Sequence, residues 1–295
     1  MSRNESISRR RFLLSAAGHS QQHKRRSNPA DKRLHHQHIR QIPPIHPEYW
    51  SFTIVGMLGA ALILSYEDTL ALPSVDVTCT IACNGKGIPR MNTACWRGIP
   101  IQTLLDQLNL RASFARFLAA DGYVTSLPME SLKDMVLAYQ MNTYPLSHEE
   151  GFPTRLIVPG YYGYKMPKWV TRMELTDTSP AGFWEARGWS GSGKVQTKAF
   201  ILSPRCYEAI TGIVTLSGNA YAGERNIGRI EVSIDDGPWM PIAFTPARPL
   251  CLTEWKIDWS PPAPGDYLIK ARAFDDGSPM QNPQTHEVVI CILEV

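Results

Sequence analysis

The hydrophobic positions along the chain repeat with a short period between residues 50 and 175. A strand, a turn, a second strand and a short acidic helix are expected at residues 50–72. Further short strands and helices are expected, in chain order, at residues 77–83, 101–110, 119–128, 129–134, 136–140, 153–160 and 168–175. Because these elements lack the regular βαβ rhythm, the pattern predicts an α+β domain over residues 33–176.

A different pattern begins at residue 199. Six strands recur there at about ten-residue spacing, separated by turn signals such as Asp275-Asp276-Gly277. Regular short strands of this kind are typical of an antiparallel, all-β sandwich. A segment rich in Gly, Ser and Trp precedes them. The sequence therefore predicts a basic tail at 1–32, the α+β domain at 33–176, a linker at 177–198 and an all-β sandwich at 199–295.

The strand that ends at Cys83 is the most informative one. Val77, Cys79, Ile81 and Cys83 share one parity, which predicts a strand with an apolar or sulfur-bearing face. Residues 84–87, with two glycines, signal a turn directly after it. Cys83 therefore precedes a glycine loop, where a side chain can point into a pocket. Cys79 has the same parity and is the competing candidate, and a buried structural cysteine is the alternative for both.

Composition and charge narrow the possible functions. The 295 residues are 43% hydrophobic and 19% charged, as in an ordinary globular protein. Ten Lys and Arg residues lie within residues 1–40, so the net charge of +3 indicates a basic N-terminal segment and not a nucleic-acid surface. The six cysteines form no motif for c-type haem, an iron–sulfur cluster or a zinc finger. No apolar run reaches the length of a membrane helix.

The N-terminal segment resembles a twin-arginine export signal. Arg9, Arg10 and Arg11 precede the apolar Phe12-Leu13-Leu14 and then small residues. The apolar stretch ends after about six residues, below the usual length, and a polar, basic segment follows it. Export to the periplasm is expected from this pattern, and a cytoplasmic protein with a basic tail is the alternative.

Several blocks, in a fixed order, resemble the molybdopterin-binding domain of the sulfite oxidase family. They are TIAC followed by the glycine loop and WRGIPI, then LAYQMN at 137–142, EEGFPTRLIVPG at 149–160 and YYGYKMPKW at 161–169. In the second domain, RIEVSIDDGPW resembles the family's immunoglobulin-like dimerisation domain. The resemblance implies this pair of folds, a molybdenum–molybdopterin cofactor (Moco) and a homodimer.

The resemblance also implies roles for individual residues. Cys83 corresponds to the family's one protein thiolate on molybdenum, a soft ligand for a soft metal centre. Tyr139 corresponds to a tyrosine beside the metal that hydrogen-bonds substrate or an oxo ligand, and Trp96 and Arg97 would line the substrate pocket. The residues expected to bind the cofactor are His38, Asp121, Glu150, Arg155, Met166, Pro167 and Lys168.

Some of these positions depart from the family pattern or have a second interpretation. Glu150 stands where the family has a histidine, and His148 is the alternative for that role. Lys165 and Lys168, three residues apart, would by themselves be read as a solvated edge. Arg187 is a further basic candidate near an anionic substrate.

Together these features predict a molybdenum-dependent oxidoreductase of the sulfite oxidase type. Oxo transfer to a small anion such as sulfite would pass electrons to a cytochrome. This cytochrome is expected to be a separate protein because the chain has no haem motif. A reductase of sulfoxides or similar oxo compounds is one alternative, and a non-catalytic binding protein that has lost the metal is another. No nucleic-acid partner is expected.

Overall fold

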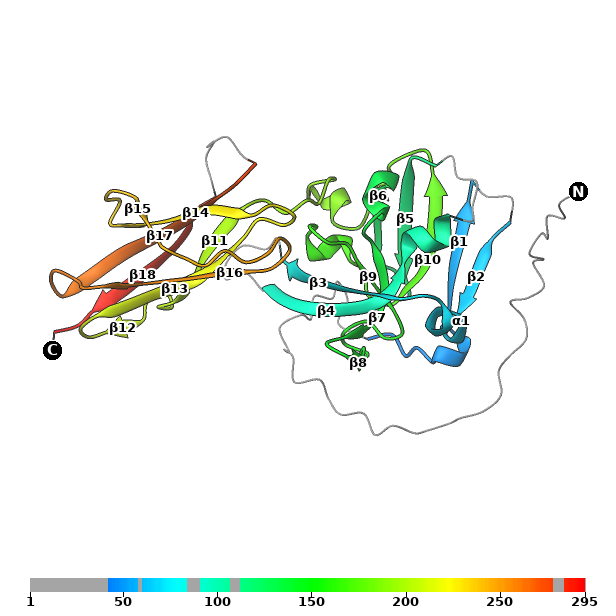
Figure 1. Ribbon diagram of the computed structural model, residues 1–295, viewed down its shortest axis with the longest axis horizontal. Helices are drawn as coiled ribbons and strands as arrows, with labels where there is room; N and C mark the ends of the chain where they lie inside the picture. The colour runs from blue at the N-terminus through cyan, green and yellow to red at the C-terminus, as the bar shows by residue number, and fades with distance from the viewer. Residues whose placement is uncertain (1–41, 58–59, 84–90, 107–111, 278–283, 295) are drawn as a thin grey trace, which may run out of the picture.

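The computed structural model describes residues 42–57, 60–83, 91–106, 112–277 and 284–294. Its strands fall into two groups that lie end to end (Figure 1). The first group, mixed with short helices, lies within residues 51–176, and the second lies within residues 198–292. The predicted fold class, an α+β domain followed by an all-β sandwich, is confirmed.

Two sheets make up the first domain. One has the strand order β2-β1-β10-β5-β6, and the other has the order β3-β4-β7-β8 with β9 paired to β7. The strands are β1 Ser51–Gly56, β2 Leu62–Ser65, β3 Val75–Ala82, β4 Met91–Pro100, β5 Phe114–Ala119, β6 Val124–Pro128, β7 Val136–Met141, β8 Tyr144–Pro145, β9 Arg155–Ile157 and β10 Val170–Thr176. The helices are α1 Tyr66–Ala71 and α2 Ile101–Leu105, with 3-10 turns at Pro47–Tyr49, Met129–Leu132, Gly163–Lys165 and Glu185–Arg187.

Local sequence accounts for the start of this domain. In β1, Phe52 and Ile54 are fully buried and alternate with partly buried residues, as a half-buried strand requires. Helix α1 begins at a capping box, in which Ser65 and Asp68 each accept a hydrogen bond from the other's backbone N–H. This exchange satisfies two donors that a helix start leaves open, so the acidic residues hold the helix in place.

β3 and β4 form the hairpin that leads to Cys83. Their antiparallel register pairs Cys79 with Ala94 and Ala82 with Met91. β3 ends at Ala82, and Cys83 follows it directly. The predicted glycine loop at residues 84–87 lies outside the described residues. Figure 1 shows the two strands running from the first domain toward the sandwich.

A bulge separates the two halves of the pairing between β4 and β7. Arg97 pairs with Gln140, but the next pair is Gly98 with Ala138, so Tyr139 is an extra residue on β7. A bulge bends its strand and changes the direction of the extra side chain. Gly98 permits this close approach, because a Cβ there would lie 2.2 Å from a carbonyl oxygen of β7. The bulge therefore gives the Tyr139 side chain a different direction from the one that regular strand pairing would give it.

The second domain is a sandwich of two sheets. One has the order β11-β13-β16 and the other the order β12-β18-β17-β14-β15. The strands are β11 Lys198–Ser203, β12 Ala209–Ile210, β13 Val214–Tyr221, β14 Ile227–Ile234, β15 Met240–Pro241, β16 Thr253–Trp259, β17 Gly265–Asp275 and β18 His286–Ile292. Buried Val, Ile, Leu and Ala side chains from both sheets, together with Trp255, form its core.

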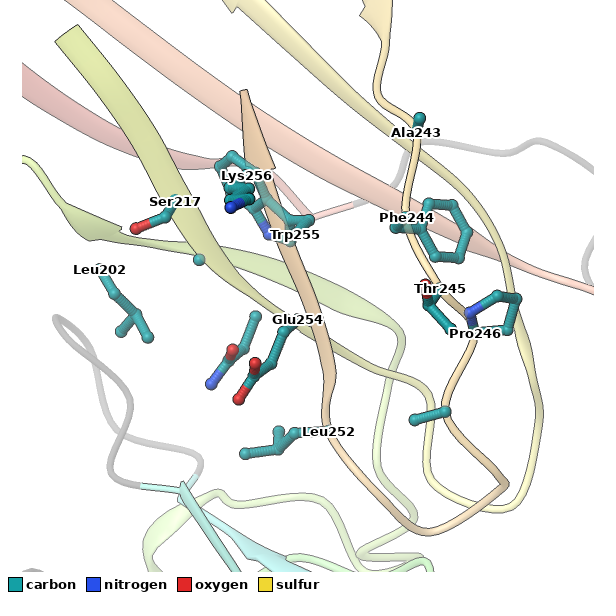
Figure 2. A pocket seen from close by; sticks show the side chains of 13 residues that line it. Leu202, Ser217, Ala243, Phe244, Thr245, Pro246, Leu252, Glu254, Trp255 and Lys256 are labelled. Carbon is teal, nitrogen blue, oxygen red and sulfur yellow. The ribbon is translucent and has the colours of Figure 1, made fainter. Parts of the chain in front are cut away.

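One sheet of the sandwich carries a surface hollow of about 960 Å³, which we call the sandwich hollow. The outward side chains of β13 and β16 and the segment 243–247 line it (Figure 2). Glu254 and Lys256 lie two residues apart on the same face of β16, and Leu202 is 44% exposed at one side. The hollow therefore combines both signs of charge with apolar surface.

A third apolar cluster joins the two domains. It contains Ala82 at the end of β3, Tyr162 and Tyr164 from the first domain, and Val195 and Tyr221 from the side of the sandwich. The backbone of β3 also takes part. Thr80 donates its N–H to the carbonyl of Leu250 at 2.8 Å, and its carbonyl accepts a hydrogen bond from the Tyr221 hydroxyl at 3.3 Å.

Several elements differ from the sequence-based predictions. Residues 91–100 form a long strand, β4, where only an approach to the helix was expected. The buried strand expected at residues 153–160 is confined to β9, and β5, β11 and β12 were not predicted. The helix expected at residues 101–110 ends at Leu105, and residues 107–111 lie outside the described ranges. None of the helices in the described part of the chain is long and apolar enough to cross a bilayer.

The region expected to be a plain linker is also structured. It holds the 3-10 turn at Glu185–Arg187, and Trp184 stacks on Trp189 with ring centroids 4.5 Å apart. Val195 is buried in the cluster between the domains. The Gly- and Ser-rich composition did not predict these contacts, because the contact that fixes Val195 involves residues distant in sequence.

Candidate functional site

Cys83 lies where three parts of the chain meet. It is partly buried directly after β3, and the preceding residue, Ala82, forms a parallel backbone bridge with Tyr162. Burial raises the pKa of Tyr162, and the nearby Cys83 sulfur acts in the same direction. Burial lowers the pKa of Lys198, at the start of β11, and the Cys83 sulfur opposes that change. Cys83 is thus surrounded by groups from both domains.

The competing cysteine, Cys79, has a different environment. It is fully buried in the core of the first domain. Burial raises the pKa of its thiol to about 12, although the nearby Arg155 acts in the opposite direction. At neutral pH Cys79 is therefore a protonated thiol enclosed in the core. Cys83, by contrast, is only partly buried and lies at the end of β3, next to groups from both domains.

Arg155 and Trp96 form the centre of a second group of predicted residues. Arg155 is 3% exposed, and its guanidinium carbon lies 5.1 Å from the centroid of the Trp96 ring. The Nη1 atom of Arg155 donates to the backbone carbonyl of Glu150 at 3.1 Å. Burial lowers the pKa of Arg155 to about 10, so the side chain stays cationic at neutral pH. Two further donors, Arg155 Nε and Trp96 Nε1, are buried and have no acceptor among the described residues.

Lys168 lies in the same group. A backbone bridge pairs it with Arg155, and its Nζ donates to the carbonyl of Glu149 at 2.6 Å. Burial lowers the pKa of Lys168 to about 7, the Arg155 charge acts in the same direction, and Glu150 and Asp121 oppose them. The structure therefore brings Asp121, Glu150, Arg155 and Lys168 close together, all of them residues expected to bind the cofactor. Trp96, which was expected at the substrate pocket, lies with this group.

The carboxylate of Glu150 stabilises a turn. Its Oε2 accepts from the backbone N–H of Ser147 at 2.8 Å, and its own N–H donates to the Ser147 hydroxyl at 3.2 Å. The alternative residue, His148, packs its ring edge-on against Phe152 with centroids 5.1 Å apart. Glu150 therefore fixes the loop that presents its carbonyl to Arg155.

Lys165 and Lys168 do not form a solvated edge, so that interpretation is wrong. Lys165 is 1% exposed, donates to the Ser126 carbonyl at 2.9 Å and forms an ion pair with Glu185. Thr125 donates to the same carboxylate at 2.9 Å. Lys165 is thus engaged within the protein, and Lys168 is the lysine that lies beside Arg155.

Met166 and Pro167 connect these two lysines through the backbone. The side chain of Met166 is buried in the core of the first domain. The carbonyl of Pro167 accepts from the N–H of Leu156 at 2.9 Å, which holds the segment against β9. Their role in the structure is to fix the position of Lys168 relative to Arg155.

Trp96 and Arg97 point to opposite faces of β4, although the sequence placed both at one pocket. Trp96 is fully buried, while Arg97 is exposed and forms a bidentate ion pair with Asp76. Its Nε and Nη2 donate to the two carboxylate oxygens at 2.8 and 2.6 Å. The hydrogen bond with Asp76 raises the pKa of Arg97, and Tyr139 adds to the effect. Adjacent strand residues alternate in direction, so Trp96 accompanies Arg155 and Arg97 accompanies Tyr139.

Two predicted residues are not part of either group as described. Arg187 is exposed, and its guanidinium stacks over the Phe183 ring at 3.7 Å. His38 lies outside the described residues. Sequence reasoning missed Tyr162 and Lys198. Tyr162 stands inside a recognised block, YYGYKMPKW, but Lys198 lies at the end of the expected linker and carries no local signal.

Comparison with known proteins identifies relatives. Residues 38–184 match the family model described as the oxidoreductase molybdopterin binding domain. The mitochondrial sulfite oxidase of Macaca fascicularis is 27% identical over 298 residues, which covers 81% of this chain and 54% of that protein. The inducible NADH nitrate reductase 2 of Glycine max is 25% identical over 285 residues, covering 71% of this chain and 32% of that protein. The chain spans about half the length of the sulfite oxidase it matches.

A solved structure with the same fold is the sulfane dehydrogenase SoxCD from Paracoccus pantotrophus. Its TM-score is 0.67 at 24% sequence identity, and the match covers 80% of this chain and 69% of that chain. At this identity the match shows a shared fold that extends over both domains.

The low pKa of Lys168 predicts a pH-dependent stability in the protein prepared without cofactor. Between about pH 7 and pH 10.5 the unfolded chain still binds the proton that native Lys168 has released. The free energy of unfolding should therefore rise with pH in this window, by up to roughly 1.4 kcal/mol per pH unit. Below pH 7 both states are protonated and Lys168 contributes no slope. Urea unfolding of the wild type and Lys168→Met from pH 6 to 10 measures the difference.

The exposed Lys194 provides the control. Lys194→Met should follow the wild-type profile, while Lys168→Met should lose the rise. Parallel profiles for wild type and Lys168→Met would show that the Lys168 ammonium is not destabilised by its surroundings.

Proposed function

Because the chain belongs to the family of oxidoreductases that share the molybdopterin-binding domain, we propose that it is a Moco-dependent enzyme acting on a small oxyanion such as sulfite. The proposed reaction is oxo transfer of the sulfite oxidase type, with the electrons passing to a separate protein such as a cytochrome. The cluster around Arg155 is the observation that carries this proposal.

The residues of that cluster fit a bound, electron-rich cofactor. Arg155 Nε and Trp96 Nε1 are two buried donors without an acceptor among the described residues, on side chains that contact each other. Leaving a buried donor unpaired costs about 1–3 kcal/mol, so such groups usually face a ligand or water. Phosphate or pterin carbonyl oxygens would satisfy both, and the Arg155 cation suits a phosphate in particular.

The arrangement assigns distinct tasks to the protein's own groups. The cofactor, when bound, supplies a metal that exchanges oxygen with substrate and accepts two electrons. Cys83 would provide the thiolate ligand, and Arg155 with Lys168 would hold the negative groups of the pterin. Glu150 keeps the 147–152 turn in place and thereby orients Arg155. Tyr139, re-aimed by the bulge, offers a phenol donor beside Arg97.

A reductase is the second candidate. The similarity to a nitrate reductase of Glycine max supports oxygen removal from a substrate as the alternative direction of the same chemistry. A binding protein without metal is less well supported, because unpaired buried donors without a ligand would only destabilise the fold.

We also propose export by the twin-arginine route, supported by Arg9-Arg10-Arg11 and the apolar residues that follow. Residues 1–41 lie outside the described part of the chain. Changing Arg9→Lys and Arg10→Lys together should retain the protein in the cytoplasm, as measured by fractionation of the native host. The change Arg25→Lys with Arg26→Lys serves as control. Equal periplasmic fractions in all three strains would refute the signal.

A homodimer is proposed through the sandwich hollow. In a two-fold interface the same patch is used twice, so Glu254 of one copy can meet Lys256 of the other while Leu202 is covered. Light scattering should give twice 33.1 kDa for the full chain at micromolar concentration. Leu202→Glu should give a monomer, while Leu293→Glu, at a similarly exposed leucine, should not. A monomeric wild type, or dimers in both variants, would contradict this interface.

The metal ligand is tested by exchanging the two cysteines separately. Cys83→Ser should lose activity by more than the roughly 10–100-fold expected when a group that only orients a ligand is removed, and should alter the visible spectrum. Cys79→Ser should keep bound molybdenum but lower the free energy of unfolding by about 1–3 kcal/mol, because a hydroxyl replaces a fully buried thiol. Metal and pterin analysis of protein produced with cofactor synthesis measures both. Loss of metal in the Cys79 variant alone would overturn the assignment.

A further inference from the structure

We propose that Lys198, which belongs to the second domain, attracts the negatively charged substrate to the site at Cys83. The inference rests on the proposed function and adds a specificity-determining residue outside the cofactor domain. It makes the site complete only when the two domains are in contact.

The position of Lys198 is fixed by the contact between the domains. It is the first residue of β11 and pairs in the sheet with Tyr221. The Tyr221 hydroxyl donates to the carbonyl of Thr80 on β3, the strand that leads to Cys83. Thus one residue links the start of β11 to the strand that positions the predicted metal ligand.

Tyr162 is close to both Lys198 and Cys83. Its backbone forms a bridge with Ala82, and the Nζ of Lys198 lies 5.8 Å from the centroid of its ring. Its hydroxyl accepts a hydrogen bond from the Gln196 backbone N–H at 3.3 Å. Cation–π attraction therefore holds the ammonium group at the ring of a residue whose backbone adjoins the strand end at Cys83.

The charge of Lys198 is available to a ligand. Two other lysines have carboxylate partners: Lys165 is paired with Glu185, and Lys270 with Asp236 and Glu287. For Lys198, no ion pair with a carboxylate is seen among the described residues, and the nearby Cys83 sulfur opposes the effect of burial on its pKa. A partly buried cation without a carboxylate partner is costly, and a bound anion would compensate for it.

Lys194 offers a matched comparison within the same segment. Its Nζ lies 6.0 Å from the centroid of the Tyr161 ring, so its relation to an aromatic side chain resembles that of Lys198. However, Lys194 lines a different cavity together with Glu130, Asp134 and Glu224. Lys194 therefore faces a cavity that three carboxylates share, away from Cys83, and it serves as the control for the charge of Lys198.

The test compares two alkylating reagents of similar size on the full-length protein without cofactor. In both cases the Cys83 thiolate displaces iodide, so a carbon–sulfur bond forms and a carbon–iodine bond breaks. Iodoacetate is an anion and iodoacetamide is neutral, and the ratio of their rates at Cys83, followed by peptide mass spectrometry, reports local charge independently of how much thiolate is present. Lys198→Gln should lower this ratio by about 3- to 10-fold. Lys194→Gln should leave it unchanged, and Lys198→Arg should preserve it.

Ionic strength provides a readout that needs no variant. Raising the salt concentration should lower the ratio in the wild type and have little effect in Lys198→Gln. An unchanged ratio in Lys198→Gln, or an equal fall in Lys194→Gln, would overturn the proposal. In the cofactor-loaded enzyme Lys198→Gln should raise KM for the anionic substrate by about 3- to 10-fold with little change in kcat. If the protein takes up no molybdenum while the alkylation ratio still depends on Lys198, the proposed function fails and the anion-attracting role stands.

Discussion

The position of β3 is the constraint on which the rest of the site depends. Within the first domain the strand pairs along its whole length with β4. On its other side, Thr80 exchanges hydrogen bonds with Leu250 and Tyr221 of the second domain. Cys83 lies three residues after Thr80, directly beyond the end of β3, so both domains determine where its sulfur lies. The sandwich is thus part of the site's framework and not only an appended module.

The first domain tolerates an unusual concentration of buried positive charge. Arg155 and Lys168 are both nearly inaccessible, and the charge of Arg155 adds to burial in lowering the pKa of Lys168. The protein compensates in part with backbone carbonyls of Glu149 and Glu150. Lys165 shows the contrasting solution, a buried ion pair with Glu185 that leaves the charge satisfied within the protein. Cations held by carbonyls alone are suited to receive an anionic ligand, because carbonyl dipoles orient them without neutralising them.

The same distinction separates the lysines near the junction of the domains. Lys194 lies among carboxylates and Lys198 lies beside Tyr162 and Cys83. The two residues are four positions apart in a segment that looks like a flexible connection. In the structure, Val195 of that segment packs with Tyr162, Tyr164 and Tyr221 in the apolar cluster that joins the two domains. Domain contact and anion recognition are therefore linked through one short stretch of chain.

The sequence by itself determined the two fold classes, the end of β3 to within one residue of Cys83, and the blocks that hold Glu150, Arg155 and Lys168, because alternation and turn residues are local properties. It left Cys79 and Cys83 as competitors, since parity is the same for both and their different burial appears only in the tertiary structure. It hid β4, where Gly98 and Pro100 interrupt the usual strand pattern. It also misjudged Lys165 and gave no sign of Lys198. Which side chains meet depends on contacts such as that of Tyr221 with Thr80, 141 residues apart, and only the packed tertiary structure brings such residues together.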